Sequence, residues 1–165
     1  MSESCDCSPS AGSDVCELRV LPKTSVVACP TNQKVGKRVN TQTVKAMLAL
    51  PLTEIRSVPY WFCPDPACPT VYYGEDGLQT FSEKDLRERV YQKNPQDENV
   101  FVCYCFQHTP KSIRAEINTA GKSLVSEYIT AGIQAEQCAC DVRNPQGSCC
   151  LGNVRQIVKT FHKTN

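Results

Sequence analysis

The chain has 165 residues, 41% of them hydrophobic, and a formal net charge of +1. This composition fits one globular unit, or two small units that each need a disulfide or a bound metal for stability. The balanced charge does not favour a nucleic-acid partner. No stretch of about 18 apolar residues is present, and Met1–Cys7 lacks the basic and apolar parts of a secretory signal. We therefore expect a cytoplasmic protein without a membrane partner, in which 12 cysteines more often bind metal than form disulfides.

Residues 1–28 combine Ser, Asp, Glu and Gly with few large apolar side chains, which predicts a disordered tail. Three cysteines lie in this segment: Cys5, Cys7 and Cys16. Two interpretations stay open. The tail is a mobile thiol arm that captures a soft ion such as Cu(I) or lends a ligand to a neighbouring site, or its thiols are spare groups on an exposed terminus.

Residues 29–98 show the pattern of a small α+β unit. Val44, Met47 and Leu48 share one face of a helix that starts near Thr41, and Pro51 is expected to stop it. Strands are predicted at 60–63, 71–73 and 80–81, with a Pro-rich loop at 64–69. A capped helix is predicted at 82–90, with Asp85 in the capping-box position.

This unit contains a candidate zinc site. Cys63 and Cys68 flank the Pro-rich loop, and Cys29 lies far upstream. A structural Zn(II) prefers four nitrogen or sulfur ligands, and Asn32 stands where a Cys-x2-Cys knuckle would supply the fourth. Cys16, another tail thiol, water or no ligand would fill that position. The alternative is that three reduced cysteines pack beneath a hairpin without metal.

The polar stretch 94–99 separates this unit from a second one, residues 99–161, which contains a second group of cysteines. In an extended backbone, Cys103 and Cys105 would place their sulfurs on the same face. Thr109-Pro110 starts a helix at about 110–118, and a second helix is expected at 123–132 with Leu124, Val125, Tyr128 and Ile129 on one stripe. This helix–turn–helix would bring Cys103 and Cys105 back to Cys138 and Cys140.

Asn144–Gly147 has the residues of a tight turn, which would fold Cys149 and Cys150 onto the same site. Soft thiolates select zinc or iron–sulfur centres. Spacing alone does not decide between Cys138 and Cys140, or between Cys149 and Cys150, and disulfides between the clusters or plain buried cysteines remain as alternatives. A helical stripe at 153–161 would cover the back of the site.

Four motifs together resemble the CopZ family. Val102–Phe106 and Cys138–Gly152 are similar to its [2Fe–2S] domain, which is related to bacterioferritin-associated ferredoxin. Cys29–Asn32 and Tyr60–Tyr73 are similar to its zinc-binding domain. The resemblance extends from about Cys29 to about Val158. Full-length copper chaperones of this family carry a further metal-transfer domain with an M-x-C-x-x-C loop, which nothing after Phe161 supplies.

The resemblance implies an α+β fold, with a small zinc-stabilised hairpin-and-helix half followed by a helix–turn–helix [2Fe–2S] half. It places the cluster ligands at Cys103, Cys105, Cys140 and Cys150, with Cys138 and Cys149 as alternates. It places zinc ligands at Cys29, Cys63 and Cys68, with Cys16 as a candidate fourth.

The expected function is one-electron transfer coupled to copper handling, in which Cu(II) becomes the Cu(I) that thiolates carry. Copper or another soft ion would be the cargo, and a metal-transporting ATPase or a redox protein the partner. The alternative is a non-redox module, held together by its metals, that docks to a metal transporter or regulator. No Ser/His/Asp set or pair of carboxylates stands out, so we expect a metal-binding or electron-transfer protein rather than a hydrolytic enzyme.

Overall fold

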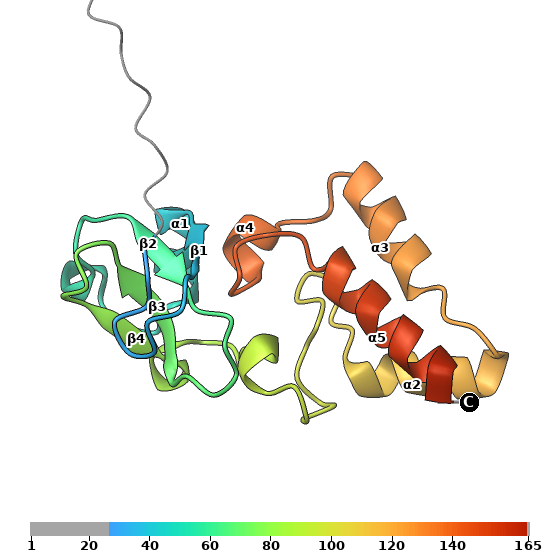
Figure 1. Cartoon of the computed structure of the whole chain (residues 1–165). Helices are drawn as coiled ribbons and strands as arrows, with labels where there is room; N and C mark the ends of the chain where they lie inside the picture. Colours follow the sequence, from blue (N-terminus) through green and yellow to red (C-terminus); the bar gives the residue numbers. More distant parts are fainter. Residues whose placement is uncertain (1–26, 165) are drawn as a thin grey trace, which may run out of the picture.

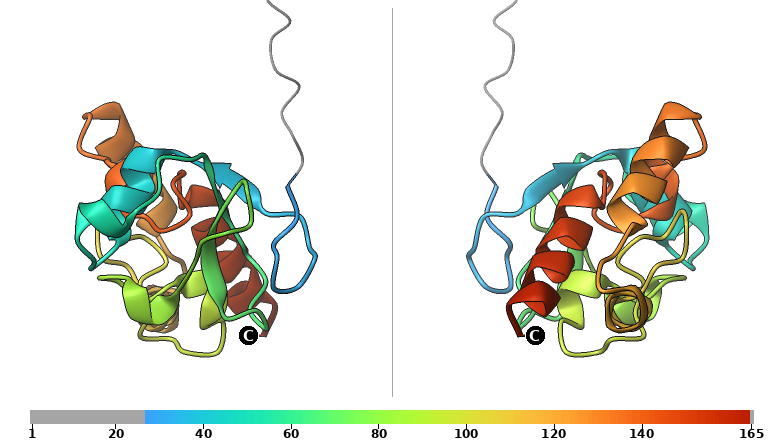
Figure 2. Two further views of the ribbon diagram at one scale, coloured as in Figure 1. Left: turned by 90° about the vertical axis from the view of Figure 1, so that its left-hand side faces the viewer. Right: turned by 90° about the vertical axis from the view of Figure 1, so that its right-hand side faces the viewer.

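The computed structural model describes residues 27–164, which form a sheet half (residues 27–98) and a helical half (residues 99–164) side by side (Figure 1). Figure 2, turned by 90°, shows one half in front of the other. The expectations for the tail, including those for Cys5, Cys7 and Cys16, lie outside the described residues. Within residues 27–164, no helix is long and apolar enough to cross a membrane. The boundaries predicted near residues 28 and 98 stay predictions.

The sheet half is built on a four-stranded antiparallel sheet in which the strands follow one another in sequence order. The strands are β1 (Lys37–Val39), β2 (Tyr60–Phe62), β3 (Thr70–Gly74) and β4 (Thr80–Ser82). The expected strands of this half are confirmed, and β1 is one that the sequence pattern did not reveal.

The two faces of the sheet serve different purposes. Phe62 pairs with Tyr72 across β2 and β3, and both side chains face the main apolar core. Trp61 pairs with Tyr73, and both face the opposite side, among three buried cysteines. This alternation follows from the two-residue period of a strand. One face therefore packs against helix α1, and the other forms the wall of a thiol-rich site.

Helix α1 (Thr41–Met47) starts where the Asn40 side chain accepts a hydrogen bond from the backbone of Gln42. Its predicted apolar face is confirmed, because Val44, Met47 and Leu48 are buried. The helix ends at Met47, before Pro51 is reached, because Leu48 is extended and forms a β-bridge with Leu86.

The helix predicted at 82–90 is wrong. The capping box of Ser82 and Asp85 is present, but it starts only a 3₁₀ turn, Glu83–Asp85. The following backbone pairs with the end of α1: Ala49 N–H bonds to the Asp85 carbonyl and Arg87 N–H to the Met47 carbonyl. Pairing with a distant segment therefore replaces the local helical hydrogen bonds.

The helical half contains the three longer helices that its sequence pattern predicts. They are α2 (Pro110–Ala120), α3 (Val125–Gln134) and α5 (Leu151–Thr164), with the short α4 (Cys140–Arg143) before the last. Thr109 caps α2, and Gly121 ends it in the left-handed conformation. Helix α5 packs against both α2 and α3, which places its buried Val154 and Ile157 beside the second group of cysteines.

The stripe predicted for α3 is only half confirmed. Val125 and Ile129 are buried, whereas the Tyr128 side chain is 65% exposed and Leu124 is also exposed. The start of α3 is held instead by the Glu116 carboxylate, which accepts hydrogen bonds from the Ser123 hydroxyl and the Leu124 N–H.

The halves are joined beside helix α4, which packs on α1. The buried Tyr72 hydroxyl donates a hydrogen bond to the Pro145 carbonyl, 2.5 Å away, in the loop that follows α4. Lys37 donates to the Ser148 hydroxyl at 2.7 Å. A strand of the sheet is thus bonded directly to the loop that leads to Cys149 and Cys150.

Replacing Tyr72 with Phe should lower the free energy of unfolding by about 1–2 kcal/mol, because the buried Pro145 carbonyl loses its donor. Anaerobic urea unfolding, followed by Trp61 fluorescence, measures this. Tyr128→Phe is the matched control, since that side chain is 65% exposed. Equal stability of the two variants would contradict the role given to the Tyr72 hydroxyl.

Candidate metal centres

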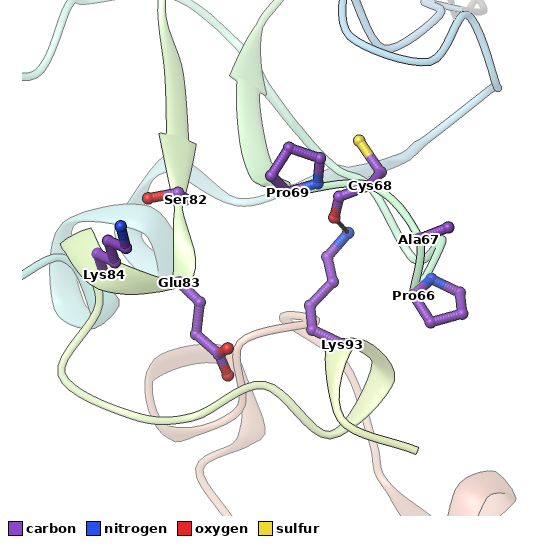
Figure 3. A pocket seen from close by; sticks show the side chains of 8 residues that line it. All are labelled: Pro66, Ala67, Cys68, Pro69, Ser82, Glu83, Lys84 and Lys93. Atoms are coloured by element: carbon purple, nitrogen blue, oxygen red, sulfur yellow. Dashed lines mark hydrogen bonds between the residues drawn. The ribbon is translucent and has the colours of Figure 1, made fainter. Parts of the chain in front are cut away.

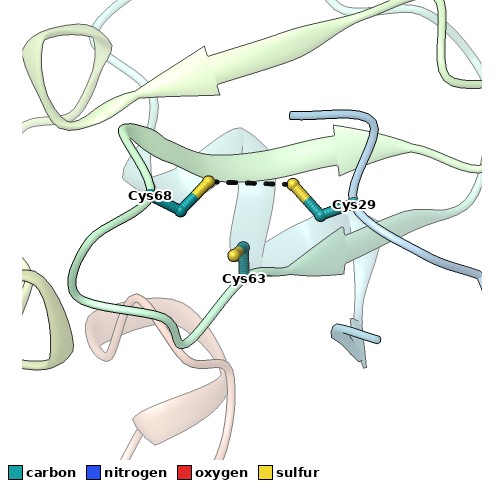
Figure 4. Close-up of side chains that lie close together, drawn as sticks. All are labelled: Cys29, Cys63 and Cys68. Atoms are coloured by element: carbon teal, nitrogen blue, oxygen red, sulfur yellow. Dashed lines mark hydrogen bonds between the residues drawn. The ribbon is translucent and has the colours of Figure 1, made fainter. Parts of the chain in front are cut away.

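The first thiol group consists of Cys29, Cys63 and Cys68, whose sulfurs all lie within 4.8 Å of one another. Cys29 lies in the segment before β1, Cys63 directly after β2, and Cys68 just before β3, so the sulfurs converge from three places on the chain (Figure 4). All three side chains are buried, and the Cys29 and Cys68 sulfurs are 3.9 Å apart. The structure thus brings together the three cysteines expected to bind zinc.

The loop between β2 and β3 has its shape fixed by Asp65. Its carboxylate accepts a hydrogen bond from the Ala67 N–H at 3.1 Å, and its carbonyl accepts one from the Cys68 N–H. At the other end, the Cys63 N–H bonds to the Val71 carbonyl. These backbone hydrogen bonds fix the two ends of the loop that carries Cys63 and Cys68.

Tyr73 holds the segment that carries Cys29. Its hydroxyl donates to the Val27 carbonyl at 2.7 Å and accepts from the Gly36 N–H at 2.9 Å. A Cβ at position 36 would lie 2.3 Å from this hydroxyl oxygen, so only glycine fits there. Burial raises the pKa of Tyr73 to about 12, which keeps the hydroxyl protonated as the donor.

Backbone and side-chain donors point at the sulfurs. Burial alone would raise the pKa of the Cys29 thiol, but the N–H groups of Thr31 and Asn32, together with the thiols of Cys68 and Cys63, outweigh it and lower that pKa. Burial raises the pKa of Cys63. Asn32, in the place of a fourth cysteine, donates its side-chain amide to the Cys63 sulfur at 3.7 Å and to Asp65 at 2.9 Å. The described residues therefore supply three thiolates, and Cys16 lies outside them.

Lys93 holds this loop through hydrogen bonds to its backbone carbonyls, a role that the sequence analysis did not predict. Its ammonium donates to the carbonyls of Asp65 and Cys68, at 2.8 and 3.0 Å, inside an open pocket of about 340 Å³ (Figure 3). The positive charge also favours the thiolate form of Cys63. Figure 3 shows the Cys68 sulfur pointing away from Lys93, so the lysine fixes the loop and leaves the sulfur free for a metal.

The second thiol group lies between the turn before α2 and the starts of α4 and α5. We call it the five-sulfur group. Its closest sulfurs are those of Cys138 and Cys140, 3.3 Å apart, and each lies 3.8 Å from the Cys105 sulfur. The thiols that form the group are Cys103, Cys105, Cys138, Cys140 and Cys150.

The extended strand expected at Cys103–Cys105 is wrong. Cys103 forms a β-bridge with His108, and the residues between them make a tight turn in which Gln107 has a positive φ of 57°. The turn still brings both sulfurs to one site. It also points Tyr104 away, where its hydroxyl donates to the Arg89 carbonyl at 2.7 Å.

The turn predicted at Asn144–Gly147 is confirmed. The Gly147 N–H bonds to the Asn144 carbonyl at 2.8 Å, and Gly147 has a φ of 64°. This turn brings Cys150 into the core, where it is 0% exposed, as is Cys103. Cys149 stays exposed and takes no part in the five-sulfur group. Cys140 is also buried, whereas Cys105 and Cys138 are partly exposed.

Protonation in this group is shared between neighbouring sulfurs. A hydrogen bond from Cys150 lowers the pKa of Cys140 to about 5 and that of Cys103 to about 7, while the pKa of Cys150 rises. Burial raises the pKa of Cys138 to about 12. A bare group of this kind cannot hold all its thiolates at once, because they repel one another, so a bound cation is needed to make them ligands together.

Comparison with known proteins defines the class. Residues 26–87, which include all four strands, match the family model of a zinc-binding domain of the CopZ type. The copper chaperone CopZ of Archaeoglobus fulgidus is 31% identical over 132 residues, which cover 80% of this chain and 62% of that protein.

A solved structure extends the match across both halves. The X-ray structure of the Archaeoglobus fulgidus CopZ N-terminal domain superposes with a TM-score of 0.66 and 30% identity, over 79% of this chain and 97% of that one. The chain belongs to the CopZ family. It spans 62% of the length of the curated CopZ relative.

Replacing Lys93 with Gln should weaken zinc binding about 10-fold, because the loop that carries Cys63 and Cys68 loses the donor that bonds two of its carbonyls. Competition with a chromophoric zinc chelator measures the affinity. Lys84→Gln is the matched control, since Lys84 lines the same pocket and is exposed. If both variants bind zinc equally well, Lys93 does not position the loop.

Proposed function

We propose that this chain is an electron-transfer and copper-handling protein that holds a [2Fe–2S] cluster in its helical half and zinc in its sheet half. The observation that carries the proposal is the convergence of the five-sulfur group around a core that α5 covers. Membership of the CopZ family supports the copper function, because the curated relative is named a copper chaperone.

The proposed cluster ligands are Cys103, Cys105, Cys140 and Cys150. They fit the group, because a [2Fe–2S] centre takes four thiolates and these come from a turn, from the start of α4 and from the residue before α5. Cys149, the alternate for the last ligand, is exposed and outside the group. When bound, the cluster supplies a one-electron couple that can convert Cu(II) into Cu(I).

The residues around the site control access to it. Cys103 and Cys150 are 0% exposed and lie in one apolar core with Ile113, Ile129 and Val154, which excludes water from that side. Cys105 and Cys138 are partly exposed. A copper ion would therefore approach the cluster on the side of these two sulfurs.

The zinc site has a different role. Cys29, Cys63 and Cys68 are buried on one face of a small sheet, with Cys16 as the proposed fourth ligand. A zinc ion bound by four thiolates is redox-inactive and contributes directly to folding, so we assign it to the stability of the sheet half. A metal-transporting ATPase or a redox protein is the proposed partner.

Alanine at Cys103 or Cys150 should remove most of the bound iron and sulfide, because each change deletes a buried ligand. Alanine at Cys149 should leave both unchanged, since that thiol is exposed. Iron and acid-labile sulfide are measured per chain after anaerobic reconstitution, with zinc content and far-UV circular dichroism as checks on folding. A Cys150→Ala variant with full iron content would refute this ligand set.

Copper reduction tests the function itself. The reconstituted protein is reduced with dithionite, freed of it by gel filtration and mixed with Cu(II) and a Cu(I)-specific chelator. The oxidised protein is the control, because it has the same thiols but no electron on the cluster. Since a [2Fe–2S] centre carries one electron, the reduced protein should form about one more Cu(I) per chain than this control. If the reduced and oxidised forms yield equal Cu(I), the redox function fails and a non-redox, metal-stabilised docking module accounts better for the chain.

A further inference from the structure

The five-sulfur group contains one thiol more than a [2Fe–2S] cluster uses. The thiol that the proposed ligand set leaves out is Cys138. It is not peripheral: its sulfur lies 3.3 Å from that of Cys140 and 3.8 Å from that of Cys105. Cys138 therefore contacts two proposed cluster ligands, and the structure gives it a place among them.

The five sulfurs divide into two subsets that share Cys140. In the first, Cys105, Cys138 and Cys140 lie within 4.8 Å of one another. The second consists of Cys103, Cys140 and Cys150, which lie in one buried cluster. The first subset faces solvent through its two partly exposed members, and the second is buried in the core.

The spacing of the first subset suits one metal ion. Two sulfurs that each lie 2.3 Å from a tetrahedral zinc are about 3.8 Å apart. Two of the three sulfur–sulfur distances in the subset are 3.8 Å, and the third is 3.3 Å. The Ala139 N–H also points at the Cys105 sulfur, at 3.4 Å, which favours the thiolate at that position.

We propose that Cys105, Cys138 and Cys140 form a three-thiolate site for a single thiophilic d10 ion, Zn(II) or Cu(I). This site shares two ligands with the cluster, so the ion and the cluster exclude each other. The mutual exclusion rests on the proposed cluster ligands, whereas the three-sulfur site rests only on the spacing of its sulfurs. The helical half then has two states, one with a buried cluster and one with a solvent-facing ion.

The two sites can be separated by mutation, because each has a thiol that the other lacks. Cys138 belongs only to the ion site, and Cys150 only to the cluster. The variants are Cys138→Ala and Cys150→Ala in the full chain, with Cys149→Ala as the matched control. The thiols of the tail are common to all three proteins, so they cancel in the comparison.

Each protein is prepared anaerobically without iron but with zinc in the sheet half. It is then titrated with Zn(II), and separately with Cu(I), against a chromophoric chelator. The control and Cys150→Ala should bind one further ion. Cys138→Ala should bind this ion more than about 100-fold more weakly. Loss of a group that only supports a ligand costs about 10- to 100-fold in metal affinity, and this variant loses a ligand itself. The ion whose affinity falls in Cys138→Ala, Zn(II) or Cu(I), is the one that the three-thiolate site binds.

The same proteins are also reconstituted with iron. Cys138→Ala should keep its cluster, and the cluster-loaded control should no longer take up the further ion. If Cys138→Ala binds both ions as tightly as the control, the three-thiolate site does not exist, even if the cluster forms. If no protein forms a cluster but the dependence on Cys138 persists, the proposed function fails while the ion site stands.

Discussion

The fold depends on a constraint set by thiolates held close together. Sulfurs 3.3–3.9 Å apart cannot all carry a negative charge without a cation between them. Both thiol groups join segments that are distant in sequence: Cys29 to Cys68 in the sheet half, and Cys103 to Cys150 in the helical half. A metal bound in each group would therefore link segments that local hydrogen bonds do not connect. Such links would add to the stability that the small apolar cores of the two halves provide.

Buried tyrosine hydroxyls place these groups relative to the rest of the chain. Tyr73 bonds the segment that carries Cys29, Tyr72 bonds the loop before Cys149 and Cys150, and Tyr104 bonds the Arg89 carbonyl in the sheet half. In each case an aromatic ring fills the core and its polar end satisfies a carbonyl that lies far away in the sequence. The sheet half thus acts as the platform against which the cysteines of the helical half are positioned.

Local signals in the sequence predicted much of this architecture. Runs of aromatic and β-branched residues predicted the strands around Trp61 and Tyr73, and Thr109 and Asn144–Gly147 correctly marked a helix start and a turn. The helix expected at 82–90 failed because Leu86 pairs with Leu48, a contact that no local pattern encodes. The role of Lys93 was also missed, because it bonds carbonyls of a loop that is distant in sequence. The sequence could not rank Cys138 against Cys140, and the structure explains why, since both sulfurs lie next to that of Cys105.

If the helical half holds an iron–sulfur cluster and the sheet half holds zinc, the purified protein should contain both. Anaerobic purification of the full chain, followed by a visible spectrum and analysis of iron, acid-labile sulfide and zinc, tests this most directly. We expect a red-brown protein with about two irons and two sulfides per chain, as a [2Fe–2S] centre requires, and about one zinc. A colourless protein that contains zinc alone, even after anaerobic reconstitution with iron and sulfide, would contradict it.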